Sequence, residues 1–149
     1  MHAFLALAAL LAVPAVRGVS IAPHYEGVRT PADTERMVDQ IADLGANWLQ
    51  VVVQWGQETV ADTEIAPYQW GTDDDEVRRV VRHARSRGLS VLVFPIVRLK
   101  VQGDGLWRGK LVPRDGAAWW ASYKRFILHY AVLSSDEGAS MFSVGSELG

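Results

Sequence analysis

The chain has 149 residues, which is enough for one domain with one sizeable core. Hydrophobic residues make up 49% and charged residues 21% of the chain, a balance that argues against intrinsic disorder. The net charge is −2 and no basic segment is suited to phosphates, which argues against a nucleic-acid partner. The absence of cysteine excludes disulfides, thiolate zinc sites and cysteine nucleophiles.

The chain opens on an apolar run, Ala3–Val13, which has the length of a secretory hydrophobic region and is too short to span a bilayer. Val13-Pro14-Ala15 follows as a small-residue cleavage site. We therefore predict a signal peptide at residues 1–15, a domain at residues 16–149, and export to the periplasm or the cell exterior. The alternatives are an uncleaved N-terminal anchor or a buried helix; no stable membrane insertion is expected.

The first predicted strand is Gly18–Pro23, and it leads into a polar loop that carries His24 and Tyr25. A helix is predicted next, because Thr30 suits the N-cap and Pro31 the first helical position. Gly45 is placed to end this helix.

The second predicted strand is Trp48–Val53, which is apolar enough to be buried on both faces. A long connection, Gln54–Tyr68, precedes a helix predicted at Asp74–Arg87 and closed by Gly88. This helix begins with acidic and ends with basic side chains, which suits the helix dipole. We interpret its arginines as a solvated face rather than a phosphate-binding patch.

The third predicted strand, Ser90–Val97, is followed by a glycine-containing loop, Arg98–Gly116. The third helix is predicted at Ala117–Leu133, and the fourth strand at Ser140–Gly145. Aromatic and apolar residues at helical spacing in this helix are Trp120, Tyr123, Ile127 and Tyr130.

Strands that alternate with helices predict an α/β fold with a parallel sheet. Two architectures share this pattern: an open doubly wound sheet and part of an eight-stranded barrel. The loop after the first strand, PHYEGVRT, lacks a glycine-rich phosphate cradle, which argues against a nucleotide-binding fold.

Ligands meet the carboxyl ends of parallel strands, so the residues that follow each strand are the candidates for a site. Polar and aromatic groups together suit a sugar, which offers hydroxyls to bond and an apolar ring face to stack on. No cofactor is predicted, and no metal site, because no ligand pair has a recognisable spacing. The candidate substrate-binding residues are His24, Tyr25, Trp55, Arg98, Trp107 and Ser146.

Glu147 is the candidate catalytic residue. A carboxyl group at the end of a buried strand has its pKa raised toward the range of a general acid. Glycoside hydrolysis needs one such carboxyl to protonate the leaving oxygen and a second as nucleophile or base. The alternative is a structural role, in which Glu147 pairs with Arg98 or caps a following helix.

The run Phe142-Ser143-Val144-Gly145-Ser146-Glu147-Leu148 resembles the fourth-strand motif of glycoside hydrolase family 113, in which the glutamate is the acid/base. Further similar features are Asn47-Trp48, Trp107-Arg108-Gly109, Trp120, Tyr123 and Tyr130-Ala131. Ser146 stands where many enzymes of this clan carry asparagine, and Arg98 where related sequences often carry histidine.

The resemblance implies the first four βα units of a (β/α)8 barrel, incomplete at the C-terminus, from a retaining glycosidase. The implied substrate is a β-linked polysaccharide or oligosaccharide of the mannan type. The clan's nucleophile lies on the seventh strand, so we expect it beyond residue 149. The alternative is a non-catalytic carbohydrate-binding protein or a half-barrel that assembles from two copies.

Overall fold

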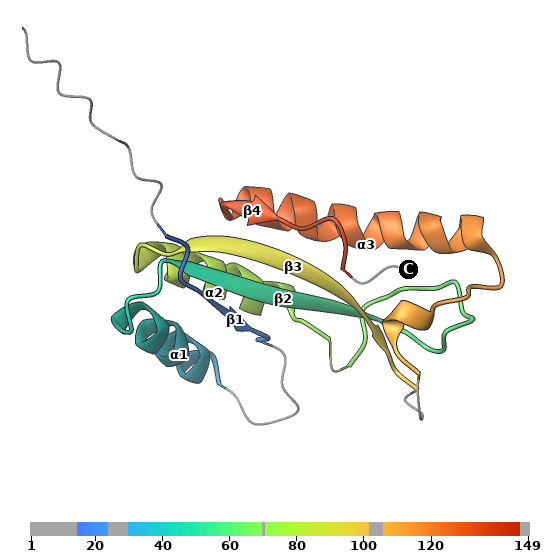
Figure 1. The fold of residues 1–149 in the computed structure, drawn as a ribbon, viewed down its shortest axis with the longest axis horizontal. Helices are drawn as coiled ribbons and strands as arrows, with labels where there is room; N and C mark the ends of the chain where they lie inside the picture. Colours follow the sequence, from blue (N-terminus) through green and yellow to red (C-terminus); the bar gives the residue numbers. More distant parts are fainter. Residues whose placement is uncertain (1–14, 24–29, 70, 102–105, 147–149) are drawn as a thin grey trace, which may run out of the picture.

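The computed structural model describes residues 15–23, 30–69, 71–101 and 106–146. These residues form a parallel sheet whose strands alternate with helices (Figure 1). Within them, no helix combines the length and the apolar character needed to cross a membrane. The predicted signal peptide lies outside the described residues except for Ala15, and N-terminal sequencing of exported protein would test it.

The sheet keeps the order of the chain. Its strands are β1 (Gly18–Ile21), β2 (Trp48–Gln57), β3 (Ser90–Leu99) and β4 (Met141–Phe142), and each pairs in parallel with the next. Because parallel crossovers are right-handed, a constant strand order places all connecting helices on one face. This arrangement is a sector of a barrel, since a doubly wound sheet reverses its strand order and has helices on both faces.

The first two helices begin at side-chain caps. Thr30 and Asp33 form a reciprocal capping box at the start of α1 (Pro31–Asp43), as the sequence predicts for Thr30. Asp73 accepts a hydrogen bond from the Glu76 amide at the start of α2 (Asp74–Ser86). Both helices end before a glycine with positive φ, at Gly45 (81°) and Gly88 (78°).

The strands differ from the predicted ones mainly at their carboxyl ends. β2 continues past Val53 to Gln57 and β3 past Val97 to Leu99, because the two strands pair along their whole length. β4 is shorter than the predicted Ser140–Gly145. A short 3-10 helix, η1 (Arg108–Lys110), lies in the predicted loop after β3.

The third helix, α3 (Gly116–Asp136), extends beyond the predicted bounds at both ends. It packs on the sheet through an aromatic row of Trp119, Tyr123, Phe126 and Tyr130, each at most 7% exposed. Trp120, which the helical spacing assigns to the same row, is instead 59% exposed. Trp119 replaces it because its indole N–H donates to the buried Gln57 side chain at 2.8 Å.

The arginines of α2 lie on a largely exposed helix face, as the sequence interpretation has it, and several of them also pair with acidic side chains of the neighbouring helices. Arg78 and Arg82 both bond the carboxylate of Glu137, the C-cap residue of α3. Arg87 pairs with Asp39 and Asp43 of α1. The basic side of α2 therefore connects the two neighbouring helices.

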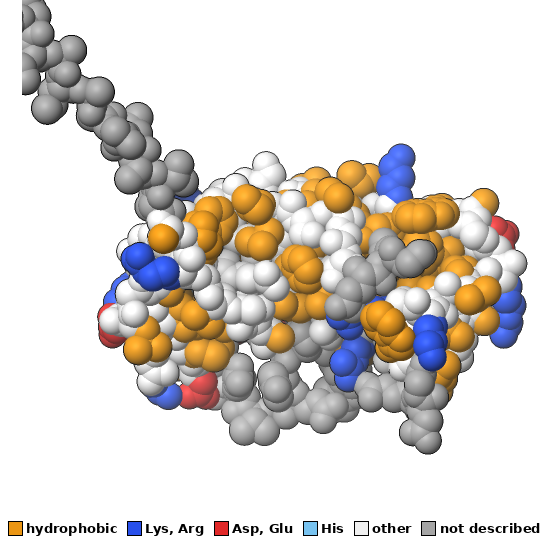
Figure 2. Space-filling model, in the orientation of Figure 1, with side chains coloured by type: hydrophobic (Ala, Val, Ile, Leu, Met, Phe, Trp, Pro, Cys, Tyr) orange, Lys and Arg blue, Asp and Glu red, His pale blue; other side chains and the backbone are white. Residues whose placement is uncertain are grey.

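The two faces of the sheet are covered very differently. The face toward the helices carries fully buried residues of both central strands: Leu49, Val51, Val53, Val91 and Val93. The opposite face, here called the inner face, is open, and hydrophobic side chains show across it (Figure 2). It contains a hollow of about 420 Å³ lined by Val19, Trp48, Leu92 and Met141, among others.

Candidate active site

The strand register separates the inner-face residues from the helix-facing ones at the carboxyl end of the sheet. Register partners of parallel strands point to the same side, and Gly56 is the partner of Arg98 while Trp55 is the partner of Val97. Val97 is buried in the core under the helices, whereas Arg98 is exposed. Arg98 therefore lies on the inner face, at the edge where a sugar is expected to bind.

Trp55 lies on the other side, facing the helices, and its role in binding the sugar stays a prediction. Its ring packs against α3, with ring centroids 5.4 Å from Phe126, 5.1 Å from His129 and 6.2 Å from Tyr130. The reason is that β2 continues to Gln57, so Trp55 belongs to the strand and follows its alternation. Trp55 is a packing residue between sheet and helix.

Tyr68 is a site residue that the sequence analysis did not identify. Its hydroxyl donates to Gln54 Oε1 at 3.2 Å, and its ring lies over Gly56. A Cβ atom on Gly56 would come within 2.9 Å of the Tyr68 ring and 2.7 Å of Lys100 Cε. Gly56 could have indicated this contact, because a glycine inside a strand often marks a close approach by another group.

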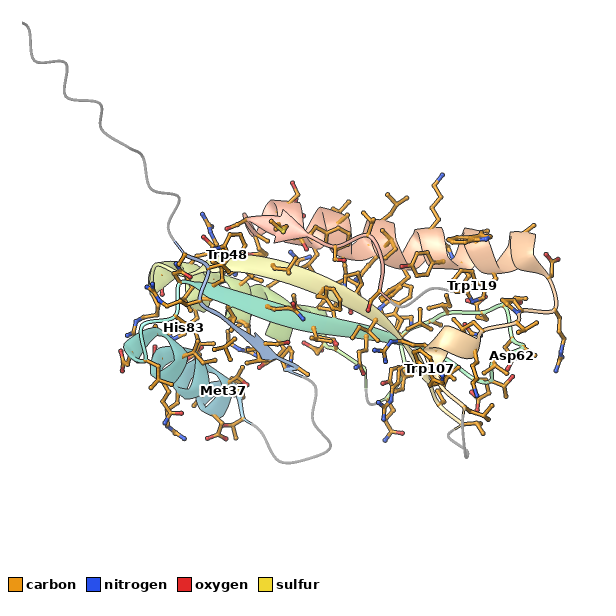
Figure 3. The ribbon with its side chains drawn as sticks, viewed as in Figure 1. Met37, Trp48, Asp62, His83, Trp107 and Trp119 are labelled. Atoms are coloured by element: carbon orange, nitrogen blue, oxygen red, sulfur yellow. The ribbon has the colours of Figure 1, made fainter. Side chains whose placement is uncertain are left out.

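Trp107 offers an aromatic surface at the carboxyl end of the sheet (Figure 3). It precedes η1 and is 49% exposed. Its ring lies over Gly109, where an added Cβ would come within 2.3 Å of the ring. The glycine thus permits this ring position, and the exposed indole can stack on the apolar face of a sugar.

The connection from β2 to α2 is fixed by one buried amide. Gln57, fully buried, donates through Nε2 to the carbonyls of Thr59 and Asp62, at 2.8 and 3.0 Å. The Thr59 hydroxyl and amide in turn donate to the Asp62 carboxylate, which lowers the pKa of Asp62. The loop above the sheet is therefore ordered by hydrogen bonds to a strand residue.

Two side-chain hydrogen bonds fix the backbone that follows β4. The Tyr123 hydroxyl of α3 donates to the Val144 carbonyl at 2.9 Å, and the Ser143 hydroxyl donates to the Gly145 carbonyl at 2.9 Å. Ser146, a predicted substrate-binding residue, is half-buried at the end of this segment. The predicted site residues His24, Tyr25 and Glu147 lie outside the described residues.

The two histidines of α2 and α3 are paired across helices or loops. His83 contacts Asp39 at 2.8 Å, and His129 contacts Asp74 at 2.9 Å. The bond to His83 is the largest cause of the lowered pKa of Asp39. In the described ranges, no three His, Asp or Glu side chains gather in a way that could hold a metal ion.

Comparison with solved structures finds β-mannanases. The β-mannanase AaManA from Alicyclobacillus acidocaldarius, solved with ManMIm, matches with a TM-score of 0.75 and 26% identity over 87% of this chain and 44% of its own. A GH113 β-1,4-mannanase, solved as a complex, matches with a TM-score of 0.67 and 25% identity over 79% of this chain and 40% of its own. The chain thus spans less than half the length of these enzymes.

Comparison with curated proteins gives no significant match. The sequence model of Glycoside Hydrolase Family 113, in contrast, matches residues 24–149, which is most of the chain. The parallel sheet with its alternating helices corresponds to the N-terminal part of that family's (β/α)8 barrel. This chain belongs to glycoside hydrolase family 113.

Proposed function

We propose that this chain is the N-terminal part of a retaining glycoside hydrolase that cleaves β-linked, mannan-type polysaccharides or oligosaccharides. The observation that carries the proposal is the family match, which extends through the Ser146-Glu147-Leu148 motif after β4. The similarity to β-mannanases supports the choice of sugar.

In this proposal Glu147 is the acid/base. It protonates the glycosidic oxygen as the bond to the departing sugar breaks, and a second carboxylate attacks the anomeric carbon. Glu147 then deprotonates the water that releases the glycosyl-enzyme, which regenerates both carboxyl groups. The nucleophile comes from a part of the protein beyond residue 149.

Other candidates bind the sugar. Arg98 and Ser146 bond hydroxyls at the carboxyl ends of β3 and β4, and His24 and Tyr25 do so after β1. Trp107 stacks on the ring face of a sugar unit, which its 49% exposure permits.

In the same proposal, the rest of the barrel covers the apolar inner face. Met141 is 54% exposed on this face and Trp48 and Leu92 are partly exposed beside it, and exposed apolar surface of this kind usually marks a contact with protein. We propose that the remaining strands of the same polypeptide supply this contact, because the related mannanases are more than twice as long as their matched parts.

The test uses the product of the complete reading frame and a panel of β-linked mannan, xylan and cellulose. We expect hydrolysis of mannan with retention of anomeric configuration, followed by NMR. Glu147→Gln should reduce kcat about 10²- to 10⁴-fold, the usual contribution of a general acid or base.

Glu64→Gln is the matched control. Glu64 is a glutamate on the β2–α2 connection, its side chain is 70% exposed, and its partner is the exposed Arg125. This variant should keep the wild-type rate. Full activity of Glu147→Gln, or mannan binding without hydrolysis by the complete wild-type protein, would overturn the proposal; the latter result favours a carbohydrate-binding protein.

A further inference from the structure

We infer that Tyr123 is a positioning residue for the acid/base Glu147, and that Trp119 and Gln57 hold Tyr123 in place. This inference rests on the proposed function, because it assigns a role relative to Glu147. It concerns a hydrogen bond from α3 to the backbone segment that leads from β4 into the site.

The first step of the argument is the bond itself. Tyr123 donates its hydroxyl proton to the Val144 carbonyl at 2.9 Å, and Val144 stands three positions before Glu147. Among residues 141–146, which the structure describes, Met141 and Phe142 alone pair as a strand, so the backbone from Ser143 to Ser146 depends on other contacts. The described contacts beyond Phe142 are the Tyr123 bond, a backbone bond from Ser143 to β3 and the Ser143 hydroxyl bond.

The second step is the rigidity of the donor. Tyr123 is 7% exposed, and its ring stacks on Trp119 at 5.1 Å with an interplanar angle of 12°. Phe126 lies edge-on to the same ring at 6.1 Å. Burial raises the pKa of Tyr123, so the phenol keeps its proton throughout the working pH range and always donates.

The third step connects this ring pair to the sheet. Trp119 donates its indole N–H to Gln57 Oε1 at 2.8 Å, and the other end of the same amide holds the loop at Thr59 and Asp62. Figure 3 places Trp119 and Asp62 near the same end of the molecule. One connected set of contacts therefore runs from the end of β2, through α3, to the backbone before Glu147.

This position matters because proton transfer to a leaving oxygen depends steeply on geometry. A misplacement of about 1 Å in a catalytic arrangement can reduce a rate about 10²-fold. A leaving group that departs without a proton avoids this dependence, since its expulsion needs little help from a general acid. The two kinds of substrate thus separate a positioning role from a general loss of folding.

The experiment compares Tyr123→Phe with wild type in the complete protein. The substrates are a manno-oligosaccharide, which needs the proton, and a dinitrophenyl β-mannoside, which does not. We expect kcat/KM to fall roughly 10-fold or more on the oligosaccharide, given the cost of misplacement, and to change little on the dinitrophenyl substrate. The alkaline limb of the pH profile, which reports the general acid, should also shift.

Tyr130→Phe is the matched control, because it removes a hydroxyl from the same helix. The Tyr130 hydroxyl bonds the Thr72 carbonyl at 3.4 Å, away from the β4 segment, so both substrates should react at the wild-type rate. Trp119→Phe, which removes the indole N–H, should give the Tyr123→Phe pattern in weaker form.

Two outcomes overturn the inference: Tyr123→Phe lowers kcat/KM equally on both substrates, or it lowers kcat/KM on neither. Glu147→Gln, measured alongside, distinguishes the two proposals. If Glu147→Gln is inactive on the oligosaccharide and Tyr123→Phe is not impaired, the inference alone fails. If Glu147→Gln is fully active, the proposed function fails first.

Discussion

The two faces of the sheet show a division between folding and function. The helix-facing side is closed, and its central residues Leu49, Val51 and Val93 have no exposed surface. The inner side is open and mixes apolar residues at the amino end with Arg98 and Tyr68 at the carboxyl end. The buried contacts that stabilise this chain therefore lie mainly on one face, and the other face is the one to which we assign ligand binding in the proposed function.

The largest expected effect is a difference in unfolding free energy between alanine variants of two leucines on the adjacent central strands. Leu49→Ala removes a fully buried side chain and should cost about 2–5 kcal/mol of unfolding free energy. Leu92→Ala, on the inner face, should cost less than half as much in the 149-residue chain, because Leu92 is already partly exposed. Urea denaturation of both variants measures the difference; equal costs would contradict the division between faces.

A smaller effect is expected at the helix layer, where Glu137 joins α2 to α3. Hydrogen bonding to Arg82, then Arg78, lowers the pKa of Glu137 below its ordinary value of 4.5. A lowered folded-state pKa stabilises the fold above the unfolded pKa, and this stability is lost as the pH falls through the folded pKa. Glu137→Gln should therefore reduce the urea midpoint by more at pH 7 than at pH 3.

The control for this experiment is Glu76→Gln. Glu76 pairs with Arg79 within α2, so it joins no two helices. Its loss should change the midpoint less than the loss of Glu137 does at pH 7. A Glu137→Gln midpoint that falls equally at both pH values would show that its carboxylate charge contributes nothing.

The smallest expected loss of unfolding free energy is at a residue of the inner face. Tyr68→Phe removes the 3.2 Å hydrogen bond to Gln54 and should cost about 0.5–1.5 kcal/mol. The ring remains over Gly56, so the backbone should not move. Urea denaturation measures the cost; a loss as large as that of Leu49→Ala would place Tyr68 among the residues that stabilise the fold.

Local signals were sufficient for much of the fold. The helix start at Thr30 and the helix ends at Gly45 and Gly88 depend on a few neighbouring residues, and the structure confirms them. It was harder to predict which side of α3 faces the sheet, because both Trp119 and Trp120 fit an apolar row. The choice between them depends on Gln57, which is distant in the sequence and, of these two tryptophans, accepts a hydrogen bond from Trp119.

For the candidate site too, local sequence signals were insufficient where the structure depends on contacts between distant residues. Arg98 was predicted as a site residue because it follows an apolar run of the third strand, and the structure places it exposed on the inner face. Trp55 was wrongly placed in the connection after the second strand, because pairing with β3 extends β2 to Gln57 and no local pattern marks that extension. Tyr68 reaches the inner face only because the loop after β2 turns back, with Gly56 pairing to Ala66.

The agreement between strand order and chain order has a consequence for synthesis on the ribosome. Each strand finds its partner in the segment translated just before it, so pairing never waits for a distant part of the polypeptide. Short separations between contacting segments favour fast folding, and chains generally fold from the N-terminus during translation. The helix-covered layer can thus be completed while the ribosome is still adding residues.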